Sequence, residues 1–284
     1  MSAAPHAPPP AWARPLVALG ARLRAVGESG ARALAYFGGL VRLLGVTLRR
    51  AVPRRLSAYG YLRLESLAAQ SVRVGVRSLP IVALVQVFIG VILALNMAPT
   101  LDSYGQLERV ADIVAIAIFR ELGPLITAIL LSGFAGASIA AELGAMVEGE
   151  EIKALRAHAL DPIGFLVVPR VLATAVMMIG LTIVADLVGV FGGFLTATLI
   201  LDVSPQVYID LTRSAVDLTD YLTGLSKAAV FGAIVATLAC YEGLNVRGGA
   251  EGVGRATTTT VVKSIVALIG ADTVFTAVFY VLGW

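Results

Sequence analysis

Long apolar stretches dominate this sequence and limit how it can fold. A chain crosses the hydrocarbon core of a bilayer either as a helix of about 20 apolar residues or as a barrel strand of about 9–11 residues. The stretches here are far longer than a barrel strand, and only 14% of the residues are charged, against about 25% in soluble domains. The sequence therefore predicts an all-α integral membrane protein of about five transmembrane helices. The predicted crossings lie at 79–98, 124–146, 163–201, 222–241 and 261–282.

Two apolar stretches are longer than one crossing needs. Residues 111–146 would make a helix of about 54 Å, whereas the hydrocarbon core is about 30 Å thick. Gly123-Pro124 predicts a break, which leaves a shorter, partly re-entrant or outer-face piece at 111–122. Residues 163–201 are expected to cross once, because a single crossing keeps the basic loop 242–263 in the cytoplasm. A re-entrant part within 163–201 stays open.

The N-terminal part of the chain is basic. Residues 1–78 hold 12 of the 22 Lys and Arg residues and only two acids. We expect a disordered Pro/Ala-rich tail at 1–11, a basic amphipathic interfacial region at 12–78 and a transmembrane domain at 79–284. Leu, Val and Tyr between the arginines favour a membrane surface over nucleic acid, and a soluble helix packed on another protein is the alternative. The Lys and Arg bias predicts a cytoplasmic N-terminus.

Small residues recur every fourth position in the crossing at 124–146. This spacing places them on one helix face, where another helix backbone can approach closely. Packing within the chain and pairing with a second copy are both open. The residues of this seam are Ser132, Gly136, Ala140 and Gly144.

The polar loop 147–161 has the pattern of a short amphipathic helix at about 148–160. Ile152, Leu155 and Ala159 share one face, and charged residues occupy the other. Such a helix between two membrane helices can dock a cytosolic partner. The alternative is a solvated loop.

Charged residues within apolar stretches are costly and usually face a cavity or a partner. They can line a substrate path, carry protons or hydrogen-bond across helices. No catalytic constellation, metal-ligand cluster or P-loop motif occurs in the sequence, so the chain is predicted to be no enzyme and to bind no metal or nucleotide of its own. The charged residues in question are Arg120, Glu121, Glu142, Asp186, Glu242 and Asp272.

Several motifs resemble those of a known permease family. RELGP stands at 120–124, IAAELG at 139–144, DP at 161–162 and VPR at 168–170, and GGAEGVG at 248–254 is followed by ATT at 256–258 and VVKS at 261–264. Over roughly residues 35–284 the chain is similar to the MlaE/YrbE permeases. The family commonly has Arg where this chain has Phe134, a basic residue in place of Val147 and a glycine in place of Ala159.

The resemblance implies five transmembrane helices with an N-terminal interfacial helix in the inner membrane of a bacterium. It implies the permease of an ABC transporter that moves phospholipids or related lipids between the inner membrane and the outer envelope. Expected partners are a second copy of the chain, a cytoplasmic P-loop ATPase that binds ATP and Mg, and an MCE-domain substrate-binding protein.

The resemblance also assigns roles to the loop. It implies ATPase contacts at Glu150, Glu151, Ile152, Leu155 and Arg156, while Asp161 shapes the end of the coupling helix. Two other functions stay open from the residues alone. One is an ion- or proton-coupled carrier that uses Asp186 and Asp272, and the other is a non-transporting membrane scaffold for envelope proteins.

Overall fold

The computed structural model describes residues 14–51 and 64–283. Every regular element within these ranges is a helix, so the predicted all-α fold is confirmed. The predicted tail at 1–11 and part of the predicted interfacial region lie outside the described residues. The chain divides into two compact units, Met1–Gly45 and Val46–Trp284.

The first unit contains most of α1 (Arg14–Ala51), a helix of 38 residues. Its segment Gly30–Ala51 is long and apolar enough to cross a membrane, so six segments among the described residues qualify as spans. A crossing would place Arg42 in the hydrocarbon core at a cost of about 3 kcal/mol. A helix in the membrane plane keeps its arginines among the headgroups, and this placement stays a prediction.

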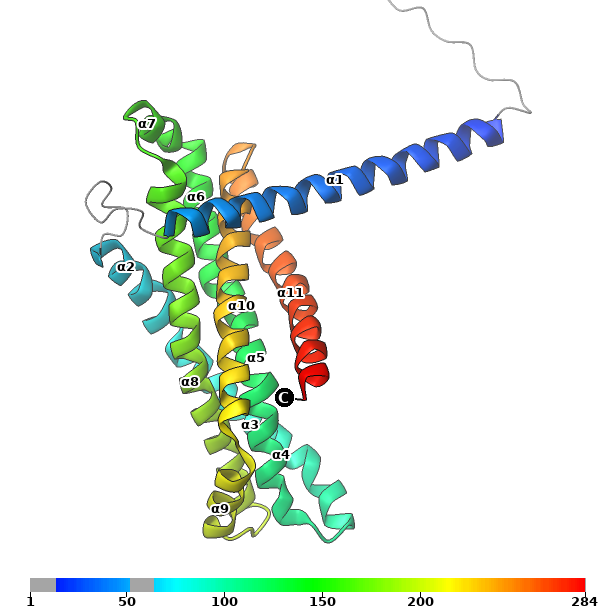
Figure 1. Cartoon of the computed structure of the whole chain (residues 1–284), viewed down its shortest axis with the longest axis vertical. Coiled ribbons are helices and arrows are strands. Elements are labelled where there is room, and N and C mark those ends of the chain that lie inside the picture. The colour runs from blue at the N-terminus through cyan, green and yellow to red at the C-terminus, as the bar shows by residue number, and fades with distance from the viewer. Residues whose placement is uncertain (1–13, 52–63, 284) are drawn as a thin grey trace, which may run out of the picture. The chain divides into compact units, whose positions relative to one another are not determined.

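The second unit is built around five long helical segments, which are coloured from cyan to red in Figure 1. Each contains one of the crossings predicted from the sequence and is long and apolar enough to span a bilayer. In the first segment the helical structure begins at Leu64, ahead of the predicted boundary at residue 79. The segments are Glu65–Ser103, Leu107–Glu148, Ile163–Leu199, Leu218–Leu244 and Gly249–Leu282.

Three of these segments contain more than one helical element. The first consists of α2 (Leu64–Ser71), the π-helical turn η1 (Val72–Val76) and α3 (Leu79–Ser103). In the third, the π-helical turn η5 (Ile163–Val167) leads into α8 (Val168–Leu199). Residues 163–199 thus form one continuous helical segment, as a single crossing requires, and α10 (Leu218–Leu244) and α11 (Gly249–Leu282) are uninterrupted helices.

The second segment remains helical through Gly123-Pro124. The predicted break there, with a separate piece at 111–122, is wrong because Leu107–Glu148 is one helical stretch of 42 residues. The π-helical turn η3 directly precedes Gly123, and a wide turn lets a helix accommodate a proline without ending. The elements are η2 (Leu107–Arg109), α4 (Val110–Ala117), η3 (Ile118–Leu122), α5 (Gly123–Leu131), η4 (Ser132–Gly136) and α6 (Ala137–Glu148).

Two short helices lie at opposite ends of the second unit. Figure 1 shows α7 (Glu151–Ala157) at the end to which α6 leads, and α9 (Pro205–Ala215) at the other end beside α4. Between them, α5, α8, α10 and α11 bury an apolar core around Phe231 and Met178.

Glycines let α3 and α8 pack with their backbones in contact. A Cβ atom at Gly90 would collide with the carbonyl oxygen of Gly189, and one at Gly192 would collide with that of Val87. Backbone atoms cannot move aside as a flexible side chain can. The close approach of these two helices therefore depends on the absence of side chains at both positions.

We expect Gly192→Ala to destabilise the protein by at least about 1–3 kcal/mol, the usual cost of overpacking. Gly180→Ala on the same helix is the matched control, because a Cβ there meets no atom within 4 Å. Thermal unfolding in detergent should show a clear fall for Gly192→Ala and none for Gly180→Ala. Equal unfolding temperatures of the two variants would contradict the close contact.

Candidate functional site

A buried lysine joins three of the long helices. The Lys227 side chain on α10 is 2% exposed, and its ammonium nitrogen lies 2.6 Å from Glu121 Oε2 and 2.9 Å from Asp272 Oδ1. It also donates a hydrogen bond to Thr276 Oγ1 at 3.0 Å. A charge in a low-dielectric interior needs such compensation. Glu121 and Asp272, predicted as separate polar residues, therefore belong to one cluster.

Arg120 lies beside this cluster and has a different partner. It forms an ion pair with Asp220, whose second carboxylate oxygen accepts a hydrogen bond from the Asp217 backbone N–H at 2.9 Å. Asp217 and Asp220 form a capping box at the start of α10. The pair thus fixes the first turn of α10 to η3.

Asp220 and Lys227 are not among the site residues predicted from the sequence. The spacing of Asp217 and Asp220 is that of a helix-capping box. Lys227 stands within an apolar stretch, where a cation requires a carboxylate partner. These two patterns are the signals that could have identified them.

Arg120, Glu121, Asp220, Lys227 and Asp272 are together called the outer polar cluster, because Asp220 lies close to α9 at one end of the unit. A cavity of about 150 Å³ adjoins this cluster. Its lining includes charged groups, two threonines and the aromatic side chains of Phe279 and Tyr280. The cavity thus combines charge with aromatic surface, which suits an amphipathic molecule.

A second polar cluster surrounds Glu142. This carboxylate pairs with Arg73 and, at 3.2 Å, with Arg170, and the Ser138 hydroxyl lies 3.5 Å from it. Arg170 also donates a hydrogen bond to the Leu166 carbonyl at 2.9 Å. Glu142 therefore ties the start of the first segment to α6 and α8, away from the outer polar cluster.

The two clusters are separated by about the thickness of a bilayer core. Glu121 and Glu142 lie on the same helical segment, about 31 Å apart at 1.5 Å per residue. On α10, Asp220 and Glu242 are about 33 Å apart by the same measure, and Glu242 pairs with Lys263 at 2.8 Å. Since the hydrocarbon core is about 30 Å thick, each of these two pairs of charged residues is spaced by about one core thickness along its helical segment.

Asp186 lies within α8 and is 1% exposed. Its Oδ1 atom is buried without a hydrogen-bond partner among the described residues. It is packed so tightly that a Cβ atom at Gly123 would collide with it. Asp186 and Asp272, the two residues of the alternative carrier hypothesis, thus differ, because Asp272 has an ion-pair partner in Lys227.

The small-residue seam packs inside the chain. Ser132, Gly136, Ala140 and Gly144 are all buried, and a Cβ at Gly144 would lie 2.8 Å from Val246. The elements that carry the seam, η4 and α6, pack against α10 and α11. Of the two interpretations of the seam, the structure favours packing within one chain.

The helix in the loop between the second and third spans is α7, and it is shorter than the predicted 148–160. Ile152 is buried, Leu155 is half-buried, and Glu151 and Arg156 are exposed. The prediction that Ala159 shares the apolar face is wrong, because Ala159 is exposed and lies beyond the helix.

Backbone conformation sets both ends of α7. Glu150 and Ala159 have φ values of 59° and 58°, which no helix can continue through. The Lys153 ammonium, 2.6 Å from Glu150, lowers the pKa of that carboxyl. At the other end, Leu160 N–H donates to the Leu155 carbonyl at 3.0 Å and Ala159 N–H to the Arg156 carbonyl at 3.0 Å. These two bonds form a Schellman motif, in which glycine usually occupies the left-handed position.

Ala159→Gly should stabilise the protein by about 1 kcal/mol, because it removes the steric cost of a left-handed alanine. The corresponding change Ala157→Gly, inside α7, should destabilise it by about 0.5–1 kcal/mol. Thermal unfolding of the two variants measures both shifts. A lower unfolding temperature for Ala159→Gly would contradict the motif.

Asp161 caps the helix that follows rather than the end of α7. Its carboxylate accepts hydrogen bonds from the backbone N–H groups of Gly164 at 2.9 Å and Ile163 at 3.4 Å. It also pairs with Arg50 at 2.5 Å. The loop that carries α7 is therefore attached to the last turn of α1 by one ion pair.

Comparison of the sequence with known proteins identifies the family of this chain. The family described as permease MlaE matches residues 67–278. A probable ABC transporter permease protein of Rickettsia felis is 36% identical over 219 residues, which cover 77% of this chain and 85% of that protein. The intermembrane phospholipid transport system permease protein MlaE of Haemophilus influenzae is 32% identical over 210 residues, which cover 74% and 80%.

A plant relative extends the comparison. The chloroplastic protein trigalactosyldiacylglycerol 1 of Arabidopsis thaliana is 33% identical over 208 residues, which cover 73% of this chain and 59% of that protein. The family match includes the five long segments nearly completely, with both polar clusters and α7. This chain belongs to the MlaE family of ABC transporter permeases.

Proposed function

We propose that the chain is the membrane subunit of a transporter that moves phospholipids, driven by a separate ATPase. The observation that carries this proposal is the family membership, together with the similarity to the phospholipid transport permease of Haemophilus influenzae. The sequence contains no P-loop motif. ATP and Mg are therefore assigned to the partner chain.

The outer polar cluster is the proposed headgroup part of the lipid path. A phospholipid needs a passage that accepts a charged headgroup and two apolar tails. The cavity beside Lys227 offers charged side chains together with Phe279 and Tyr280. A headgroup phosphate would compete with Glu121 and Asp272 for Lys227, so that passage of the lipid rearranges existing ion pairs instead of exposing a bare charge.

The sequence also predicts Asp186 and Glu142 as residues of the substrate path, but their surroundings do not support this role. Asp186 is packed against Gly123 and does not line the cavity beside Lys227. Glu142 holds two arginines at the opposite end of the bundle. Neither is assigned to the headgroup path.

The proposed ATPase contact is the exposed face of α7. Glu150, Glu151 and Arg156 are exposed there, whereas Ile152 is 7% exposed. We therefore assign Ile152 as the anchor that holds α7 to α6, and the charged residues with Leu155 as the contact. Asp161 would transmit movement of the loop to the start of α8.

The remaining partners follow from the same proposal. A second copy of the chain would complete the passage, and an MCE-domain protein would receive or deliver lipid on the outer side. The N-terminus and α7 would face the cytoplasm in the inner membrane of a bacterium. The basic residues of the N-terminal part support that orientation.

Transfer of a fluorescent phospholipid by the reconstituted permease with its ATPase tests the function. Transfer should require hydrolysable ATP and should continue in the presence of an uncoupler. Transfer without ATP, abolished by the uncoupler or by Asp186→Asn, would favour the carrier instead. Assembly with envelope proteins but no transfer under either condition would favour the scaffold.

A further inference from the structure

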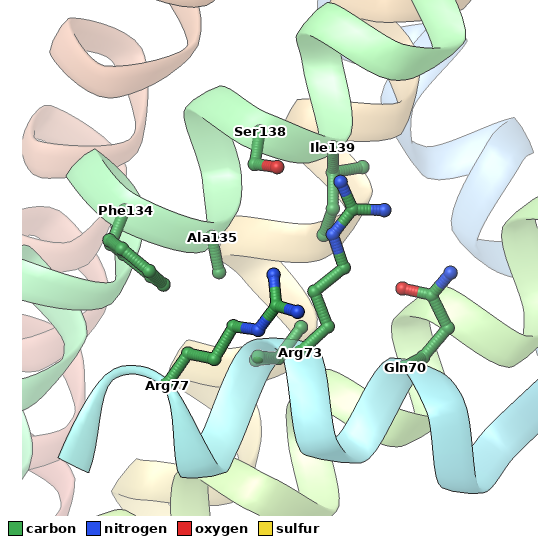
Figure 2. Close-up of a pocket in the computed structure, with 8 residues that line it drawn as sticks. Gln70, Arg73, Arg77, Phe134, Ala135, Ser138 and Ile139 are labelled. Atoms are coloured by element: carbon green, nitrogen blue, oxygen red, sulfur yellow. The ribbon is translucent and has the colours of Figure 1, made fainter.

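A cavity of about 130 Å³ lies between the start of the first segment and the middle of the second. Figure 2 shows Arg73, Arg77 and Gln70 rising from one helix toward Phe134, Ser138 and Ile139 of the other. The volume is far above the roughly 15 Å³ that one water molecule requires. This cavity is distinct from the one beside Lys227 and has no role in the function proposed above.

The cavity carries a surplus of positive charge. None of the described residues that line it is acidic. The nearby Glu142 is shared between Arg73 and Arg170, while the Arg77 side chain is exposed and has no ion pair within the described ranges. Of the two arginines that line the cavity, Arg73 is thus neutralised by Glu142, whereas Arg77 remains available to an anion.

Neutral polar groups add to the binding capacity of the cavity. Gln70 Oε1 is buried without a hydrogen-bond partner among the described residues, and rotation of the amide would present its NH₂ group to the same space. The Ser138 hydroxyl lies on the opposite wall. Arginine, amide and hydroxyl donors together suit the oxygens of a phosphate group.

Exposed apolar side chains accompany these polar groups. Phe134 lines the cavity and is 45% exposed. Val72, Val76 and Leu79, which lie close to the arginines in sequence, are between 41% and 56% exposed, and Leu79 begins the apolar stretch of α3. Arginines directly before such a stretch lie at the level of lipid headgroups. A ligand with both a phosphate and acyl chains would therefore satisfy the arginine and the apolar rim together.

We propose that this cavity binds the phosphodiester headgroup of an anionic phospholipid, with Arg77 as the main phosphate ligand. Its assignment to the cytoplasmic leaflet rests on the orientation in the proposed function. The binding itself needs neither ATP nor the ATPase. The site holds a lipid at the entrance to the bundle, at the opposite boundary from Lys227.

Binding of fluorescent phosphatidylglycerol to the detergent-purified full chain tests the site. Arg77→Ala should weaken binding about tenfold, as loss of one charge-assisted hydrogen bond predicts. Phe134→Arg, which adds a cation to the rim, should strengthen it. Arg213→Ala, at an exposed arginine on α9, is the matched control and should leave binding unchanged.

Three competitors identify the chemical group that the site binds. Unlabelled phosphatidylglycerol should displace the probe, whereas diacylglycerol, which lacks the phosphate, should not. Inorganic phosphate at millimolar concentration should also fail; displacement by it alone would assign the site to a soluble anion and overturn the lipid proposal. Equal binding by Arg77→Ala, Arg213→Ala and the unmodified chain would also overturn it. Because no ATP is present, these results are independent of the transport test.

Discussion

Replacement of Lys227 by methionine is expected to destabilise the protein by about 3–5 kcal/mol, the usual cost of breaking a buried ion pair. The Lys227 side chain is 2% exposed and contacts both Glu121 and Asp272. Methionine fills a similar volume but leaves two carboxylates facing each other without a cation. Thermal unfolding in detergent, followed by size-exclusion chromatography, measures the effect.

Lys263→Met on α11 is the matched control for that variant. Lys263 pairs with Glu242 at 2.8 Å, but its side chain is 40% exposed, and exposed ion pairs contribute about 0–1 kcal/mol. Combining Lys227→Met with Glu121→Gln and Asp272→Asn should restore most of the lost stability, since the uncompensated charges disappear. If Lys227→Met were as stable as Lys263→Met, the claim that the buried ion pairs of Lys227 stabilise the protein would be contradicted.

The restored triple variant then separates structure from transport. It should fold and associate with the ATPase, but it should lose lipid transfer, because the headgroup no longer meets charged groups. Full transfer by this variant would remove the outer polar cluster from the lipid path. The seam residues provide no such separation, since they pack inside the chain.

The five long helical segments of the second unit could be predicted from the sequence because each apolar stretch must satisfy its backbone hydrogen bonds within a helix. Helix ends and interruptions could not. Gly123-Pro124 suggested a break, yet the adjacent π-helical turn absorbs the proline. Ala159 suggested a continued apolar face, yet its positive φ ends the helix. Both outcomes depend on tertiary packing that local patterns do not contain.

The candidate site shows the same limit. Charged residues in apolar stretches could be recognised one by one, because each is costly in hydrocarbon. Their partners could not: Arg120 and Glu121 are neighbours in sequence but pair with Asp220 and Lys227 respectively. Helix spacing decides which side chains on one helix share a face. Only the packing of three helices decides which side chain on another helix they meet.

The second large effect is expected at α7. Glu151→Arg combined with Leu155→Asp should reduce association with the ATPase more than tenfold, because the variant reverses a charge and buries a new one in the proposed contact. ATP-driven lipid transfer should fall with it. Co-purification with the ATPase and transfer assays on the same preparation measure both quantities. Glu108→Arg, at an exposed glutamate in η2, is the control at the opposite end of the unit.

A further variant distinguishes contact from force transmission. Ile152→Ala shortens the buried anchor of α7 but leaves its charged face unchanged. We expect the ATPase to bind this variant normally and to hydrolyse ATP, while lipid transfer falls because movement of α7 no longer reaches α6 and α8. Normal transfer by Ile152→Ala would show that α7 serves only as a docking site. Normal ATPase binding by the Glu151→Arg, Leu155→Asp variant would contradict the proposed contact on α7. The ATPase would then have to contact another cytoplasmic segment, such as the loop around Gly248.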